Sequence, residues 1–147
     1  MHRFNLPRFN WAAAAAAALL VTGCAQPMPF AGGLSGAQTV PPNSSAGTGT
    51  VTARVFPSTK AMTYKIEYAG LSGPATAAHV HGPAAPGANA GVVVPFASAA
   101  SPITGGATLT DAQLADVMAG KWYANVHTAA SPGGEIRGQL QQGVMAK

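Results

Sequence analysis

Two neighbouring segments predict the fold class: residues 47–56 read GTGTVTARVF, and residues 61–69 read AMTYKIEYA. In the second segment apolar or aromatic side chains occupy every other position from Met62 to Tyr68, and polar side chains alternate with them. The first segment alternates threonines with small or branched apolar residues in the same way. A period of two is typical of a strand with one buried face. Pro57 and Ser58 favour a turn between the two strands.

The rest of the chain after residue 70 continues this pattern, with one exception. Short extended runs separated by Gly and Pro are predicted at residues 75–82, 91–96, 121–128 and 135–140. The exception is residues 110–113, TDAQ, which have the form of a capping box and predict a short helix that ends at Gly120. We therefore expect an all-β protein, an antiparallel β-sandwich of about seven short strands with one short crossover helix.

The N-terminus predicts export. Residues 1–11 carry Arg3 and Arg8 without an acidic residue, and the apolar run at 12–21 is shorter than the ~20 residues that span a bilayer. Residues 21–24, VTGC, resemble the lipobox of bacterial lipoproteins. We expect a signal peptide at 1–23, cleavage before Cys24, and acylation of that cysteine. An ordinary signal peptide or an uncleaved anchor are the alternatives.

Lipid chains on Cys24 would attach the protein to a membrane. No aspartate follows Cys24, which favours the outer membrane, facing the periplasm, over retention at the inner membrane. Residues 24–33 contain Pro27, Pro29 and a glycine pair, and are expected to form an acylated tether. The expected organisation is then a domain at 34–141 and a tail at 142–147.

The charge distribution excludes a nucleic-acid partner. The chain carries eight Lys and Arg and four Asp and Glu; without the two arginines of the leader the net charge falls to +2. The remaining cations are scattered singly, so they form no stripe that could follow a phosphate backbone.

Four segments together resemble the CHRD domain, which is named after the animal protein chordin. They are residues 34–42 (LSGAQTVPP), 78–82 (AHVHG), 125–128 (NVHT) and 134–140 (GEIRGQL). The resemblance runs from Leu34 to Leu140 and implies a sandwich fold. Thr39 departs from it, since glutamate is usual there. The repetition of the domain in chordin suggests a non-catalytic interaction module, although the sequence specifies no protein partner.

The three histidines beyond the leader, His79, His81 and His127, all lie within these segments. Positions i and i+2 of a strand share a face, so His79 and His81 point the same way. If the strand of His127 is a neighbour, three imidazoles can hold copper or zinc. The alternative is a structural role, with hydrogen bonds to side chains such as Glu135 or Asn125. The His-Val-His triplet also resembles the copper strand of copper-zinc superoxide dismutases.

The remaining polar residues predict no catalytic centre. Glu135 and Arg137 alternate along one strand and are expected to be solvated or paired across strands. The glycine pairs at 105–106 and 133–134 are expected in turns. We therefore expect action by binding rather than by catalysis. Three hypotheses remain: a metal-binding protein, a structural or interaction module, and a dismutase-type oxidoreductase.

Overall fold

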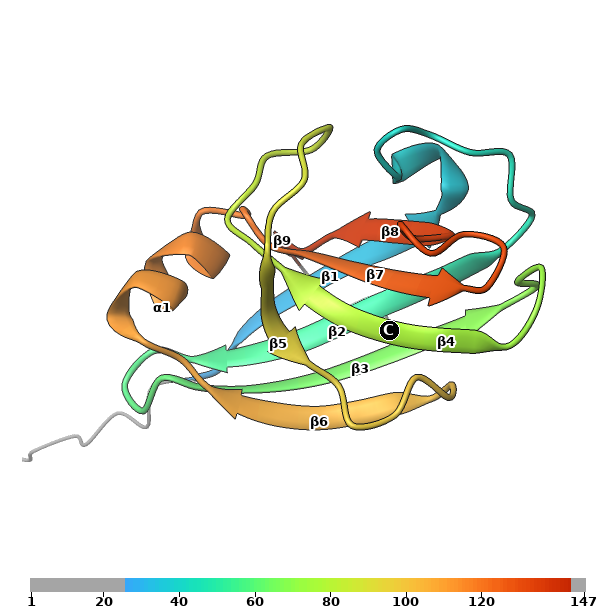
Figure 1. The fold of residues 1–147 in the computed structure, drawn as a ribbon. Helices are drawn as coiled ribbons and strands as arrows, with labels where there is room; N and C mark the ends of the chain where they lie inside the picture. Colours follow the sequence, from blue (N-terminus) through green and yellow to red (C-terminus); the bar gives the residue numbers. More distant parts are fainter. Residues whose placement is uncertain (1–25, 144–147) are drawn as a thin grey trace, which may run out of the picture.

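The computed structural model describes residues 26–143, which form nine strands and one α-helix (Figure 1). The strands are β1 (Met28–Ser35), β2 (Thr48–Phe56), β3 (Ala61–Ala69), β4 (Ala75–His81), β5 (Val92–Pro95), β6 (Ile103–Thr108), β7 (Tyr123–Thr128), β8 (Ile136–Gln139) and β9 (Gln141–Gln142). The helix α1 spans Asp111–Met118, and a 3₁₀ turn, η1, spans Gly36–Gln38. The all-β prediction with one short helix is confirmed.

All strand pairs are antiparallel, and the strands follow the order β5-β4-β7-β8-β1-β2-β3-β6, with β9 beside β1. The pairing between β8 and β1 is limited to Ser35 and Arg137. At this junction the sheet folds over, so that β4, β7 and β8 lie in front of β1, β2 and β3 (Figure 1). The two layers of the expected sandwich are therefore parts of one continuous sheet.

Two glycines permit the close approach of β1 and β8. A Cβ at Gly32 would lie 2.1 Å from the carbonyl oxygen of Gln139, and one at Gly138 would lie 2.5 Å from that of Gly33. Any side chain at either position would push the strands apart. The sharp fold of the sheet therefore depends on these two residues.

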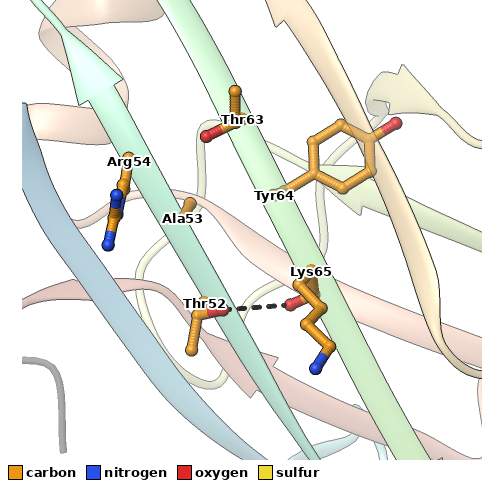
Figure 2. A pocket seen from close by; sticks show the side chains of 6 residues that line it. All are labelled: Thr52, Ala53, Arg54, Thr63, Tyr64 and Lys65. Atoms are coloured by element: carbon orange, nitrogen blue, oxygen red, sulfur yellow. Dashed lines mark hydrogen bonds between the residues drawn. The ribbon is translucent and has the colours of Figure 1, made fainter.

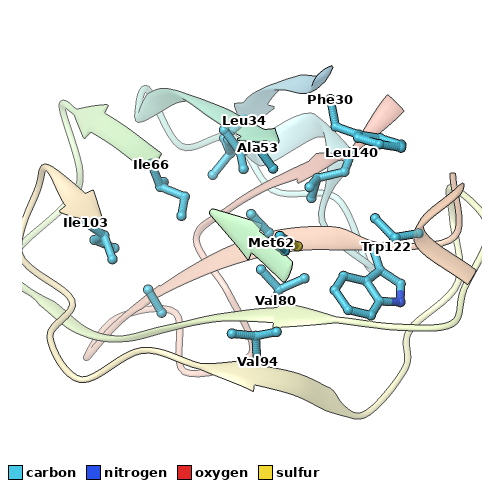
Figure 3. Packing of buried hydrophobic residues seen from close by; sticks show 14 of the residues in the cluster. Phe30, Leu34, Ala53, Met62, Ile66, Val80, Val94, Ile103, Trp122 and Leu140 are labelled. Atoms are coloured by element: carbon cyan, nitrogen blue, oxygen red, sulfur yellow. The ribbon is translucent and has the colours of Figure 1, made fainter. Parts of the chain in front are cut away.

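The core lies between the two layers, where buried apolar side chains pack against one another (Figure 3). Burial of apolar surface is the main force that holds such layers together. The largest apolar side chains that are almost completely buried are Phe30, Met62, Ile66, Trp122, Ile136 and Leu140. A Cβ at Gly82 would lie 2.4 Å from the Trp122 ring, so the strand end of β4 packs directly on the indole.

Helix α1 covers one end of the layers and begins as the sequence predicts. The Thr110 hydroxyl accepts a hydrogen bond from the Gln113 amide (3.2 Å), and the Gln113 side-chain oxygen accepts one from the Thr110 amide (2.9 Å). These bonds satisfy two amides at the start of the helix. Gly120 has a φ of 69°, the left-handed conformation expected at the helix end.

Several boundaries differ from those expected. Residues 28–33, expected in the tether, belong to β1, and Gln142, expected in the tail, pairs with Phe30 in β9. Gly105 and Gly106 lie within β6, where they pair with Tyr64 and Thr63 of β3, rather than in a turn; the Tyr64 ring fills the space that a side chain at residue 105 would need. Gly133 is in a turn, as predicted.

The predicted signal peptide and Cys24 lie outside the described residues. Within residues 26–143, the one α-helix has neither the length nor the apolar composition needed to cross a membrane.

Candidate metal centre

The three histidines lie on the outer face of the layer that contains β4 and β7. In β4, Ala78 and Val80 point into the core, so His79 and His81 point outward. In β7, Ala124 and Val126 point inward, so His127 is also on the outer face. The two strands pair directly, as the metal hypothesis required, and the register places His127 opposite Ala77 and next to His79 along the diagonal.

The imidazole nitrogens come close enough to share one ion. One ligand nitrogen from each of His79, His81 and His127 lies within 4.8 Å of the other two. The Nδ1 of His79 and the Nε2 of His127 are already 3.3 Å apart. With metal–nitrogen bonds of about 2.0 Å, ligand nitrogens stand roughly 3.3–3.5 Å from each other. Small side-chain rotations of His81 would therefore complete a three-nitrogen site.

Backbone carbonyls fix the protonation of two of the rings. The Nδ1 of His81 lies 3.0 Å from the carbonyl oxygen of Ala90, and the Nδ1 of His127 lies 2.9 Å from that of Pro132. A carbonyl oxygen can only accept, so in both neutral rings the hydrogen is on Nδ1 and the lone pair is on Nε2. Metal-binding histidines are commonly oriented in this way.

The Nε2 of His81 is buried and has no hydrogen-bond partner among residues 26–143. A buried nitrogen that makes no hydrogen bond costs free energy, because it has lost its contact with water. A metal ion among the three rings would remove this cost. This nitrogen is therefore an observation that favours a ligand rather than a purely structural cluster.

His79 takes part through Nδ1. Because the Nε2 of His127 is an acceptor, the hydrogen between the two rings belongs to the Nδ1 of His79 when no ion is bound. Metal binding would require that hydrogen to move to Nε2 of the same ring. The donor set is then Nδ1 of His79 and Nε2 of His81 and His127.

The surroundings favour neutral imidazoles. Burial lowers the pKa of His79 below its ordinary value of 6.5, and the nearby His127 lowers it further. Burial also lowers the pKa of His81; the Ala90 carbonyl opposes this change, while His79, His127 and Arg137 add to it. Neutral rings keep the lone pairs that a metal ion needs.

Tyr123 and Arg137 support His81 from one side. The rings of His81 and Tyr123 stack with centroids 5.0 Å apart and planes 5° from parallel. The Arg137 guanidinium carbon lies 3.6 Å from the centroid of the Tyr123 ring. The Tyr123 hydroxyl accepts a hydrogen bond from the Ala90 amide (3.0 Å), so the same residue holds both the tyrosine and His81. The alternation along β7 places Tyr123 on this face, whereas nothing in the sequence indicates Ala90.

The expectation for Glu135 and Arg137 was wrong. Both are buried, with exposed fractions of 1% and 2%. The Glu135 carboxylate accepts hydrogen bonds from Ser45, Ser72 and Thr128 rather than from a histidine or an arginine. The structural alternative for the histidines named Glu135 or Asn125 as partners; the acceptors for His81 and His127 are backbone carbonyls instead.

A groove on the layer that contains β2 and β3 lies apart from the histidines. It has a volume of 240 Å³ and lies over β2 and β3, between Thr52 and Arg54 on one strand and Thr63 and Lys65 on the other (Figure 2). Lys65 forms an exposed ion pair with Glu67 (2.8 Å). The lining residues include none of the three histidines.

The CHRD domain model matches residues 30–140. The match covers more than half of the chain and contains all three histidines, so the chain belongs to the CHRD domain family. Neither the curated proteins nor the solved structures gave a match. Membership supports a binding or structural module, and fold membership alone names no chemistry.

Proposed function

We propose that this CHRD domain binds a copper ion, or a zinc ion in its place, through His79, His81 and His127. The observation that carries the proposal is the convergence of three imidazole nitrogens within 4.8 Å on one sheet face. The carbonyls of Ala90 and Pro132 support it, because they leave two lone pairs free for an ion.

The donor set favours copper. Imidazole suits both copper and zinc, and among divalent ions copper has the higher intrinsic affinity. Three neutral imidazoles bring no negative charge, and the positive charge of Arg137 acts on His81. A monovalent ion meets less repulsion there than a divalent one. We therefore expect Cu(I) to bind more tightly than Zn(II), with the protein acting by binding or transferring the ion rather than by catalysis.

Calorimetric titration of the untagged, metal-free mature protein with Cu(I), Cu(II) and Zn(II) tests the proposal. We expect one ion per chain, bound more tightly than micromolar, with affinity that falls when the pH drops below the lowered pKa values of His79 and His81. Replacing any one histidine by glutamine should weaken binding by about tenfold or more. Thr63→Gln, on the far layer, is the matched control and should bind like the unaltered protein. Absence of saturable binding for all three ions would refute the proposal.

Nitrogen NMR of the imidazole rings tests the donor atoms separately. In the metal-free protein, His81 and His127 should both be in the form protonated at Nδ1. Addition of Zn(II) should shift Nε2 of these two rings and Nδ1 of His79. If the rings are unaffected although an ion binds, the ion occupies another site.

One observation favours a second candidate, an interaction or structural module with structural histidines. The hydrogen bond between His79 and His127 already gives both nitrogens a partner without metal. In that case the histidine variants should lower the thermal midpoint, and the unaltered protein should bind none of the three ions.

We also propose that the protein is a lipoprotein of the bacterial cell envelope, held in the outer membrane on the periplasmic side by acyl chains on Cys24. The cationic segment, the apolar run and the small residues before the chain's only cysteine support this. Cys24→Ala should move the protein to the soluble periplasmic fraction or leave an uncut precursor, as fractionation and mass measurement would show. A variant that is processed and sediments with membranes like the parent protein would refute the anchor.

A further inference from the structure

A second cavity lies on the sheet face that carries the three histidines, on the β8 side of Tyr123. It has a volume of 320 Å³ and is lined by Arg137 and Gln139 of β8 and by residues of two loops, among them Thr39, Val40, Pro42 and Pro86. The Asn89 side-chain amide donates a hydrogen bond to the Val40 carbonyl (3.2 Å) and so links the two loops. Figure 1 shows these loops at the top of the view, above β7 and β8.

The charge of Arg137 is not balanced by any carboxylate of the described residues. Three of the four acidic side chains, Glu67, Asp111 and Asp116, pair with surface lysines. The fourth, Glu135, accepts its hydrogen bonds from Ser45, Ser72 and Thr128. Arg137 is nevertheless only 2% exposed, which makes it a buried cation without an anionic partner in the part of the chain that the structure describes. Such an arrangement is unfavourable unless another group supplies the missing charge.

The neutral partners of Arg137 use only part of its hydrogen-bonding capacity. The guanidinium reaches the side-chain oxygens of Asn89 and Gln139, both at 3.4 Å, and packs on the Tyr123 ring. A guanidinium has five N–H donors, and two long bonds to amides leave most of them unused. Carboxylates and phosphates are the groups whose geometry this planar donor set matches.

We propose that this cavity binds the carboxylate of a small amphipathic molecule, with the carboxylate on Arg137 and the apolar part against Val40, Pro42 and Pro86. The single cation matches one negative charge better than the two of a phosphate. At about 30 Å³ per water-sized group, the volume accommodates roughly ten non-hydrogen atoms.

Titration of the metal-free mature protein with benzoate, followed by NMR, tests this site without reference to the histidines. We expect saturable shifts of the Arg137 side chain, Val40 and Gln139 at roughly millimolar benzoate. Acetate should bind more weakly because it lacks the apolar part. Benzamide, which has the same shape without the charge, should produce no saturable shift, and neither should inorganic phosphate. Equal binding of benzamide, or no saturable shift with benzoate, would overturn the proposal.

Two variants with the same change in charge complete the experiment. Asn89→Asp replaces the exposed amide that already contacts Arg137 by a carboxylate of the chain itself, so it should weaken benzoate binding by about tenfold or more. Thr63→Asp places the same charge on the far layer and should leave binding unchanged. If Asn89→Asp binds benzoate as well as the unaltered protein does, Arg137 is not the receptor and the proposal fails. A lack of metal binding would leave this result unaffected.

Discussion

Glu135 is a buried carboxylate whose hydrogen-bond partners are all neutral. Burial alone would raise its pKa, but donors from Ser72, Thr128 and Ser45 together lower it from 4.5 to about 2. Each carboxylate oxygen accepts two hydrogen bonds, at distances between 2.6 and 2.7 Å. These donors come from three separate places: the loop after η1, the loop between β3 and β4, and the end of β7. Glu135 therefore joins three segments at one end of the sheet.

Glu135→Gln should lower the free energy of unfolding by about 2–3 kcal/mol, because the charge-assisted hydrogen bonds are lost and an N–H₂ group faces hydroxyl donors. Urea denaturation at neutral pH measures the loss. Glu67→Gln removes the same charge from an exposed ion pair and should change stability by less than about 1 kcal/mol. Equal losses in the two variants would show that the network around Glu135 contributes nothing beyond its charge.

At the level of single residues, the candidate histidines could be predicted from the sequence, whereas the groups that hydrogen-bond to them could not. Strand alternation in the sequence places His79 and His81 on one face, whereas the pairing that brings His127 beside them is known only from the structure. The carbonyls of Ala90 and Pro132 belong to loops, and a backbone oxygen leaves no mark on the amino-acid sequence. The alternation of Glu135 and Arg137 suggested an exposed strand face, but loops cover that face of β8.

Among the elements, the strands with clear alternation were predicted and those with glycine pairs were not. Residues 28–33 were predicted to belong to the tether, and the glycine pair at 105–106 was predicted to lie in a turn, because glycine is common in both. In the structure the glycines make room: Gly32 for the backbone of β8, and Gly105 for the Tyr64 ring. Composition alone does not distinguish a glycine in a turn from a glycine in a strand whose missing side chain lets another segment pack closely.

The capping box of α1 allows a test of one element. Thr110→Ala removes the hydroxyl that accepts a hydrogen bond from the Gln113 amide, and it should destabilise the protein by roughly 0.5–2 kcal/mol. The thermal midpoint should fall accordingly. Thr110→Ser keeps the accepting oxygen and should stay within a few tenths of a kcal/mol of the parent. If alanine and serine behave alike, the cap does not stabilise this helix.

For the whole molecule, the half-buried histidines and the buried Glu135 predict a stepwise loss of stability in acid. The pKa values of His79 and His81 are lowered from 6.5, so below that pH the unfolded chain binds protons that the folded chain excludes. Their contribution to stability is complete above 6.5 and declines as the pH falls towards the lowered values. The contribution of Glu135 is lost between 4.5 and about 2.

Denaturation of the metal-free protein at a series of pH values should therefore show two declines, one below ~6.5 and one below ~4.5. The double variant His79→Gln/His81→Gln should remove the upper decline and keep the lower one. Glu135→Gln should do the reverse. An upper decline that persists in the double variant would mean that other groups titrate there.

The pairing of β1 with β8 and β9 brings the beginning and the end of the described domain together. β1 lies in the interior of the strand order, and its partners on one side are separated from it by about a hundred residues of chain. The N-terminus of a chain leaves the ribosome first. β1 therefore cannot pair with β8 and β9 until almost the entire domain has been synthesised. Contacts so distant in sequence form slowly. A partly synthesised chain should therefore remain unfolded, which is the state that the proposed export across a membrane requires.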